Sequence, residues 1–131
     1  MHDGIILIVE DDPTLQMVMR RTLEYLGYVC EVAESGEEAV ARHDSDIALI
    51  LMDIGLPGIQ GGHATLLIRE KELNEGRARV PIVALTGHAQ REQCLQAGMD
   101  DFLQKPALMA DLERIIARWC PGCRKLQPCD P

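Results

Sequence analysis

An α/β domain built on a doubly wound parallel sheet is the fold that the sequence predicts, and three observations lead to it. Short apolar runs rich in β-branched residues alternate along the whole chain with segments of helical, 3.6-residue periodicity. Most connections between them are short, and capping residues mark several helix starts. Right-handed crossovers leave few topologies for such a chain, so we expect a (βα)5 arrangement with strand order 2-1-3-4-5.

The first half of the chain contains the first two strand–helix units. The run Ile5–Val9 predicts a strand buried on both faces. Asp12 is placed to cap a helix that has Pro13 at its first position and ends at Gly27. One face of that helix is expected to carry Leu15, Val18, Met19, Thr22, Leu23 and Leu26. A second strand, Tyr28–Ala33, and a short helix capped by Ser35 and running to about His43 follow.

The second half of the chain repeats the pattern. A third buried strand, Ile47–Met52, ends at Asp53 and is followed by a loop and a helix running to about Glu75. The fourth strand is expected over Val80–Leu85, with a helix ending at Gly98 after it, and the fifth over Phe102–Gln104. The last helix places Leu108, Leu112, Ile115, Ile116 and Trp119 on one face.

Composition limits what the chain can do. Its 131 residues suit one domain, over residues 1–119, with a tail over 120–131. The formal charge of −8 argues against nucleic-acid binding, which needs clustered Lys and Arg. No apolar stretch is long enough to cross a membrane and no signal peptide is present, so we expect no membrane contact by this domain and a cytoplasmic location.

Polar residues gather where the predicted strands end. Ligands of open parallel sheets bind outside the carboxyl ends of the strands, at the point where strand order reverses. In the expected order this crevice lies between the first strand, which is followed by Glu10 and Asp11, and the third, which ends at Asp53. Thr86 and Lys105 end the fourth and fifth strands at the same edge.

These residue types predict phosphoryl transfer to an aspartate. Several carboxylates in one crevice need a cation, and a ligand set made only of oxygens favours Mg²⁺, for which Mn²⁺ or Ca²⁺ can substitute. A carboxylate nucleophile beside Mg²⁺, flanked by ammonium and hydroxyl groups, is what in-line attack on a phosphoryl group requires.

The motifs at these strand ends resemble the response-regulator receiver family of two-component signalling. They are ILIVEDDP, LMDIGLPG, ALTGHA and GMDDFLQKP, and they occur in that order over residues 4 to about 119. The resemblance implies a flavodoxin-like fold with Asp53 as the phosphoacceptor. It further implies that Asp11 binds the metal directly, that Glu10 holds metal-bound water, and that the backbone carbonyl of Gly55 completes the shell.

The same resemblance assigns the remaining site residues. Thr86 would hydrogen-bond one phosphoryl oxygen and Lys105 would pair with another, aimed inward by a cis peptide between Lys105 and Pro106. Phe102 stands where many receivers carry a switching tyrosine. Phenylalanine has no hydroxyl, so the tyrosine-specific hydrogen bond is excluded, but rotamer coupling with Thr86 remains an option. Gly55 and His88 occupy positions that bear on the dephosphorylation rate in the family.

The resemblance also implies partners. The donor would be a phospho-His on a sensor histidine kinase or a His phosphotransfer domain, which would dock on the first helix and the loop after the fifth strand. Phosphorylation would then bias the surface of helix four, strand five and helix five. The chain would be a signalling module that catalyses only its own phosphorylation and dephosphorylation, either standing alone or cut from a hybrid histidine kinase.

Other candidate residues have simpler interpretations. Asp12 is expected to be a helix cap and not a metal ligand, while Asp100 and Asp101 are expected to be solvated turn residues. His43, His63 and His88 are expected on the surface. For the tail cysteines Cys120, Cys123 and Cys129 a flexible end is the first expectation, with half of a zinc site or a disulfide as alternatives.

Two other functions fit the same fold. An aspartyl-phosphate hydrolase would need a second Asp two residues after the nucleophile, where this chain has Gly55. A receiver that is never phosphorylated and only binds partners would be expected to lack Asp53, Lys105 or the acidic pair, and all of these are present. The phosphoacceptor function is therefore the leading hypothesis.

Overall fold

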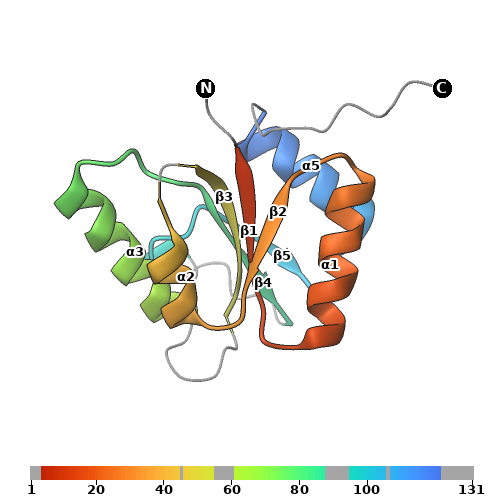
Figure 1. The fold of residues 1–131 in the computed structure, drawn as a ribbon, viewed down its shortest axis with the longest axis horizontal. Coiled ribbons are helices and arrows are strands. Elements are labelled where there is room, and N and C mark those ends of the chain that lie inside the picture. Colours follow the sequence, from red (N-terminus) through yellow and green to blue (C-terminus); the bar gives the residue numbers. More distant parts are fainter. Residues whose placement is uncertain (1–3, 45, 55–60, 88–94, 106, 122–131) are drawn as a thin grey trace.

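The structure is a computed structural model of the 131-residue chain that describes residues 4–44, 46–54, 61–87, 95–105 and 107–121. Its central feature is a five-stranded sheet in the order β2-β1-β3-β4-β5, with every neighbouring pair parallel (Figure 1). The strands are β1 (Ile5–Val9), β2 (Cys30–Ala33), β3 (Ile47–Asp53), β4 (Ile82–Thr86) and β5 (Asp101–Gln104). The predicted fold class and strand order are confirmed.

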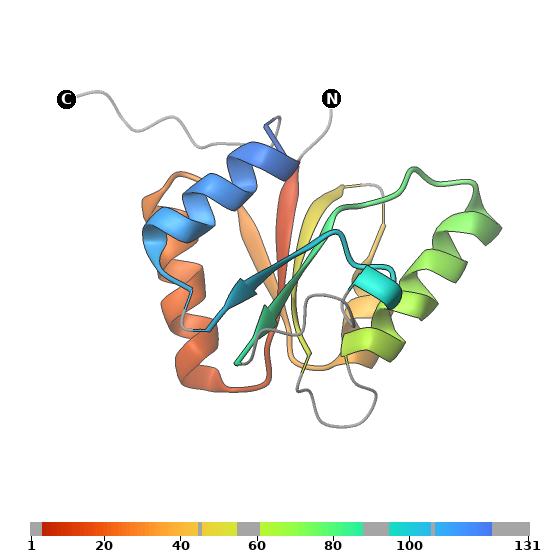
Figure 2. The ribbon, with the colours of Figure 1, turned by 180° about the vertical axis from the view of Figure 1, so that it is seen from behind.

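Helices cover both faces of this sheet. The described helices are α1 (Pro13–Tyr25), α2 (Gly36–Arg42), α3 (Gly61–Glu75) and α5 (Met109–Trp119). Helices α1 and α5 lie on one face, and α2 and α3 lie on the other, as both views show (Figures 1 and 2). The expected helix ending at Gly98 falls mostly on residues outside the described ranges. Within those ranges, no helix is both long and apolar enough to cross a membrane.

The central strands are buried on both faces and supply two apolar cores. Every residue of β1 and β4 is buried, because each strand is covered by helices above and below. Successive side chains therefore enter opposite cores. Leu7 and Val9 join the cluster under α2 and α3, whereas Ile6 and Ile8 join the cluster under α1 and α5. Continuous apolar runs such as Ile5–Val9 are the sequence signature of this arrangement.

Helix α1 is capped as predicted but buries less of its apolar face. The side chain of Asp12 accepts hydrogen bonds from the backbone nitrogens of Thr14 and Leu15, at 2.8 and 3.3 Å. Of the predicted face, Met19 and Leu23 are buried, but Leu15 and Val18 are 36% and 54% exposed. The predicted apolar face is therefore only partly buried, because α1 turns a narrow stripe of it toward the sheet.

A buried polar cluster joins α2, α3 and the start of β4. His43 and Glu72 are 2% and 4% exposed, and His43 Nε2 lies 3.0 Å from Glu72 Oε2. The same carboxylate accepts hydrogen bonds from the backbone nitrogen of Val80 and from the guanidinium of Arg69. The expectation that His43 is exposed was therefore wrong, since α3 covers it; His63 is exposed as expected.

Two aspartates before and within β5 also depart from expectation. Asp100 accepts hydrogen bonds from Arg69, from Arg79 and from the backbone nitrogen of Ile82, so it fixes the start of β4. Asp101 accepts a hydrogen bond from the indole of Trp119 at 2.9 Å and so ties β5 to α5. Neither is a solvated turn residue, because each faces a donor from an element distant in sequence.

The start of β4 and the end of α5 depart from the predictions in smaller ways. Strand β4 begins at Ile82 and not at Val80, because Pro81 has no N–H to donate and the N–H of Val80 is taken by Glu72. Cys120, the residue after α5, is disulfide-bonded, which favours the disulfide alternative for this cysteine. Cys123 and Cys129 lie outside the described residues.

The cap at Asp12 leads to a stability prediction. Asp12→Ala removes the acceptor of two backbone N–H groups, so we expect the free energy of unfolding to fall by about 1 kcal/mol. Chemical denaturation in metal-free buffer measures this loss. Asp11→Ala is the matched control, because Asp11 is the exposed neighbouring carboxylate and makes no cap bond among the described residues. Equal losses in both variants would contradict the assignment.

The buried His43 leads to a prediction about pH. Burial lowers the pKa of His43 below the usual 6.5; Glu72 opposes this shift, while Arg77 and Lys71 reinforce it. The folded protein then binds a proton more weakly than the unfolded chain. Stability that is complete above pH 6.5 should therefore be lost as the pH falls below that value.

Urea unfolding at pH 7.5 and pH 5.5 tests this. We expect His43→Gln to show a smaller difference between the two pH values than the wild type shows. The exposed His63 provides the control, since His63→Gln should keep the wild-type difference. Burial raises the pKa of Glu10, which acts in the opposite direction but equally in all three proteins. An unchanged pH dependence in His43→Gln would rule out the assignment.

Candidate functional site

The carboxyl ends of β1, β3, β4 and β5 form one edge of the sheet, and the predicted site residues lie along it. Glu10 follows β1, Asp53 and Thr86 are the last residues of β3 and β4, and Lys105 follows β5. The register explains the convergence: Asp53 pairs with Leu85, one residue before Thr86, whose carbonyl accepts the backbone N–H of Lys105 at 2.7 Å. The strands thus deliver Glu10, Asp53 and Lys105 to one crevice, and Thr86 ends the strand next to Asp53.

Three carboxylates meet in this crevice. Glu10, Asp11 and Asp53 each place an oxygen such that all three oxygens lie within 4.8 Å of one another. Glu10 and Asp53 are 2% and 5% exposed, whereas Asp11 faces solvent. Two buried acids with a third at the rim form an open, oxygen-only set of ligands, and no other such group of acidic, His and Cys residues occurs among the described residues.

Lys105 compensates part of this negative charge. Its ammonium nitrogen lies 3.0 Å from Asp53 Oδ2 and 3.2 Å from Glu10 Oε1, so one cation bridges two carboxylates. Lys105 crosses from the far edge strand to reach them, and about 28% of its side chain remains exposed. The bridge needs β5 to lie beside β4 and β4 beside β3, which is the order that the sheet has.

The electrostatics of the crevice appear in two pKa values. Burial raises the pKa of Glu10; the backbone N–H of Asp12 opposes this, and the neighbouring Asp53 adds to it. Burial lowers the pKa of Lys105, but the hydrogen bond and charge of Asp53, with those of Glu10, outweigh it and the net shift is upward. Three carboxylates face one ammonium in this crevice, so the site carries net negative charge, which favours binding of a cation.

Thr86 and Phe102 lie on one face of the sheet. Phe102 pairs with Ala84 across β4 and β5, and Thr86 comes two residues after Ala84, so the three side chains point the same way. Thr86 is 2% exposed, while Phe102 is half-buried and packs against the core under α2 and α3. Thr86 thus ends the strand beside Asp53, and Phe102 lies further down the face that Thr86 shares; the switch role assigned to this pair stays a prediction.

Two supporting residues were not expected from the sequence. The side-chain amide of Gln16 donates to the backbone carbonyl of Glu10 at 2.7 Å and so fixes the turn that carries the acidic pair. Gly61, the first residue of α3, lies against the backbone of Asp53. Gln16 follows the cap residue Asp12 by one helical turn and Gly61 opens a Gly-Gly pair, but neither pattern by itself indicates a site.

Some predicted residues lie outside the described ranges. These are Gly55, whose carbonyl was expected in the metal shell; Pro106, expected in a cis peptide with Lys105; and His88. Their assignments remain expectations.

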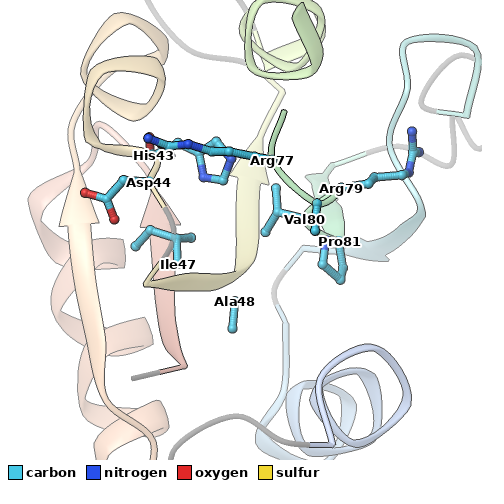
Figure 3. Close-up of a pocket in the computed structure, with 9 residues that line it drawn as sticks. His43, Asp44, Ile47, Ala48, Arg77, Arg79, Val80 and Pro81 are labelled. Atoms are coloured by element: carbon cyan, nitrogen blue, oxygen red, sulfur yellow. Dashed lines mark hydrogen bonds between the residues drawn. The ribbon is translucent and has the colours of Figure 1, made fainter. Parts of the chain in front are cut away.

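A separate cavity of about 330 Å³ lies at the opposite end of the sheet, near the amino ends of β3 and β4 (Figure 3). Ile47, Val80 and Pro81 line it, together with the ring of His43. The charged ends of Asp44 and Arg79 point away from it in Figure 3, because they pair with Arg42 and Asp100. The Nδ1 atom of His43 is buried and has no hydrogen-bond partner among the described residues. With Asp44 and Arg79 paired elsewhere and no carboxylate cluster among its lining residues, this cavity lacks the groups for phosphoryl chemistry.

The crevice at the carboxyl ends is different in kind. It presents a carboxylate that could act as a nucleophile, an ammonium 3.0 Å away from that carboxylate, and two further acids able to hold a divalent cation. This is an arrangement suited to receiving a phosphoryl group, since transfer depends mostly on positioning and on charge stabilisation.

Comparison with known proteins agrees with this geometry. Residues 6–117 match the family described as the response regulator receiver domain. The chain is 36% identical over 118 residues to the sensor protein GacS of Pseudomonas syringae pv. syringae, covering 87% of this chain and 13% of GacS. It is 40% identical to the hybrid signal transduction histidine kinase G of Dictyostelium discoideum, covering 88% of this chain and 4% of that kinase. The chain thus spans a small part of these relatives.

Solved structures give the same result. The receiver domain of the sensor histidine kinase PA1611 from Pseudomonas aeruginosa PAO1, with a magnesium ion in its active-site cleft, is 42% identical with a TM-score of 0.79, over 91% of this chain and 98% of that one. The match to the complex of Saccharomyces cerevisiae Ypd1, a histidine phosphotransfer protein, with the Ssk1 receiver domain has 30% identity and a TM-score of 0.84, over 94% and 93% of the two chains. From its motifs, fold and site, this chain belongs to the response-regulator receiver domain family.

Proposed function

We propose that this domain accepts a phosphoryl group from a phospho-His onto Asp53, with Mg²⁺ bound beside it. The observation that carries the proposal is the position of Asp53: buried at the end of β3, 3.0 Å from the Lys105 ammonium and grouped with two further carboxylates. A carboxylate that served only the fold would not need two acids beside it, because their repulsion destabilises the folded state.

The residues present fit a divalent cation. Glu10, Asp11 and Asp53 offer oxygen atoms only, and the exposed Asp11 leaves one side open to water and to phosphate oxygens. These three residues would hold Mg²⁺, and Mn²⁺ or Ca²⁺ can take its place. When bound, the ion offsets the charge of the acidic cluster and of the phosphoryl oxygens.

The chain's own groups then have separate roles in the transfer. An Asp53 carboxylate oxygen attacks phosphorus in line, the new O–P bond forms as the P–N bond breaks, and the electron pair of that bond leaves with the imidazole of the donor. Lys105 would move with the charge, from the free carboxylate to a phosphoryl oxygen. The Thr86 hydroxyl, buried at the end of the neighbouring strand, would donate to another.

The surface beside the crevice suits a phosphotransfer partner. A cavity of about 220 Å³ lies between α1 and the segment after β5, and its lining combines apolar side chains with the two charged site residues: Leu15, Val18, Met19, Leu85, Ala107, Glu10 and Lys105. Leu15, Val18 and Leu108 are exposed around it. An apolar side chain of the partner seated here would bring its phospho-His to Asp53. We therefore propose that α1 and the segment after β5 form the docking surface for a histidine kinase or His phosphotransfer domain.

The output side of the proposal concerns β5 and α5. Phosphorylation would reposition Thr86 and Phe102 and thereby alter the surface of helix four, β5 and α5. Because the indole of Trp119 donates to Asp101, we expect a shift of β5 to be passed on to α5. The domain would act in the cytoplasm as a switch that turns over only its own phosphoryl group, alone or within a hybrid kinase, and without contacting nucleic acid or membrane.

The first test is chemical phosphorylation. On incubation with acetyl phosphate and Mg²⁺, intact-mass spectrometry should show a gain of about 80 Da on the wild type, the mass of one phosphoryl group. Asp53→Asn should gain none because its amide is not a nucleophile. Asp11→Ala should also gain none while keeping its wild-type circular dichroism spectrum, since Asp11 is exposed and serves the metal and not the core.

Two outcomes of this experiment would overturn the proposal. An adduct that persists in Asp53→Asn would place the phosphoryl group elsewhere, and no adduct on folded wild-type protein in saturating Mg²⁺ would mean that the site does not accept phosphate.

A second test concerns docking. With a phosphorylated His phosphotransfer domain as the donor, we expect Val18→Glu to slow transfer at least about tenfold, because it puts a charge on an apolar contact surface. Modification by acetyl phosphate should be unaffected by this change. Leu73→Glu is the matched control, since Leu73 is 83% exposed on α3, on the other face of the sheet. Equal transfer rates for Val18→Glu and wild type would exclude α1 as the docking surface.

A further inference from the structure

The first residue of α3 touches the backbone of the residue that carries the chemistry. A Cβ atom built on Gly61 would lie 2.6 Å from the carbonyl oxygen of Asp53, 2.8 Å from the Cα of Ile54, and 3.1 Å from the Cγ of Met52. Two of these three neighbours are backbone atoms, which cannot rotate aside as the end of a side chain can. An ordinary contact would need at least about 3.4 Å.

Conformation does not explain the glycine at this position. The described glycines with a positive φ angle are Gly4, Gly27, Gly76 and Gly98, and Gly61 is not among them. An L-residue could therefore adopt the Gly61 backbone without strain. Position 61 requires glycine only because there is no room for a Cβ atom next to the backbone of Asp53.

Helix α3 is held in place and cannot retreat from this contact. The guanidinium of Arg69 donates to the carbonyls of Gly98 and Val80 and to the carboxylate of Asp100, at 2.7 to 3.1 Å. One turn further along, Glu72 bonds to His43 and to the backbone of Val80. These partners lie just before β4 and β5 or directly after α2, so moving α3 outward would break several of these hydrogen bonds at once.

The first turn of α3 is fixed as well. The hydroxyl of Thr65 donates to the carbonyl of Gly61 at 2.8 Å, and Thr65 is fully buried. A Cβ on Gly98 would lie 3.5 Å from the Thr65 methyl group, so the turn at Gly98 packs closely against this part of the helix. By contrast, Ile54 is joined to β4 by one long hydrogen bond, from its N–H to the Leu85 carbonyl at 3.3 Å. The Asp53–Ile54 segment is therefore the side that would yield.

We propose that Gly61 is a positioning residue for Asp53: with no side chain, it lets the fixed helix α3 seat the end of β3 so that the Asp53 carboxylate meets Lys105 and the acidic pair. The inference rests on the proposed function, because it concerns the geometry of the same transfer. A methyl group at position 61 would push the Asp53 carbonyl from 2.6 Å to about 3.4 Å or more from the Cβ, and the carboxylate would move with its backbone. A displacement approaching 1 Å is enough to slow a positioned reaction by as much as about 100-fold.

The experiment compares Gly61→Ala with Gly62→Ala, its neighbour in the same helix. A Cβ on Gly62 would lie 3.6 Å from the Cβ of Ala97, an ordinary contact, so this control adds the same methyl group without a clash. Under conditions in which both variants are folded, we expect the rate of modification by acetyl phosphate and Mg²⁺ to fall about 10- to 100-fold for Gly61→Ala and less than about twofold for Gly62→Ala.

Two further readouts separate positioning from a general loss of stability. The amide of Ile54 should exchange hydrogen faster in Gly61→Ala than in the wild type or in Gly62→Ala, because its bond to Leu85 is lengthened. Ile116→Val, a change at a buried residue of α5 on the opposite face of the sheet, serves as a destabilised control. It should lower the unfolding temperature yet keep the wild-type rate of modification.

The possible outcomes distinguish failure of the proposed phosphoacceptor function from failure of the positioning role of Gly61. If wild-type protein gains no phosphoryl group, the proposed function fails and the role of Gly61 fails with it. If the wild type is modified on Asp53 and folded Gly61→Ala is modified at the same rate, only the positioning role is overturned. If Gly61→Ala does not fold even in a stabilising osmolyte such as sucrose, Gly61 serves the fold and not the site, and the proposal is likewise overturned.

Discussion

The constraint on which this structure depends is the repulsion among the carboxylates at the end of the sheet. Glu10 and Asp53 are almost fully buried, and an isolated buried carboxylate is strongly destabilising unless it is paired. Lys105 lies within 3.2 Å of both and supplies the pairing. Because Lys105 follows the edge strand β5 and Glu10 follows β1, the pairing can form only when the whole central sheet is in register.

The charged groups at the amino ends of β4 and β5 are paired more completely than those of the acidic crevice. There most polar groups are satisfied by one another, with His43 Nδ1 as the exception among the described residues. Glu72 is bonded to His43, Arg69 and Val80, and Asp100 to Arg69, Arg79 and Ile82. These bonds join α2, α3 and the starts of β4 and β5 into a stiff frame. The negatively charged crevice at the carboxyl ends of the strands thus shares the sheet with a nearly complete polar network at the other end. Any conformational change is therefore expected at the carboxyl end.

The sequence predicted the fold and the residues of the crevice because both depend on local patterns. The apolar run Ile5–Val9 and its equivalents specify strands, and strand order places their last residues together. It did not predict that His43 is buried or that Asp100 fixes β4. Each depends on a residue of α3 that is distant in the sequence: Glu72, 29 residues from His43, and Arg69, 31 residues from Asp100. Leu15 and Val18 match the helical period yet face solvent, since periodicity shows that a helix has an apolar face but not how wide the sheet beneath it is.

Phosphorylation of Asp53, as proposed, would alter the balance that Lys105 maintains. A phosphoryl group brings more negative charge and more acceptor oxygens than the carboxylate it modifies, so the ammonium would shift from Glu10 toward the phosphoryl oxygens. Lys105 and Glu10 also line the cavity beside α1 where the partner is proposed to dock. Any change in their pairing therefore changes the wall of that cavity. Linkage then requires the partner's affinity to differ between the two forms of the domain, and the site that receives the phosphoryl group would also regulate release of its donor.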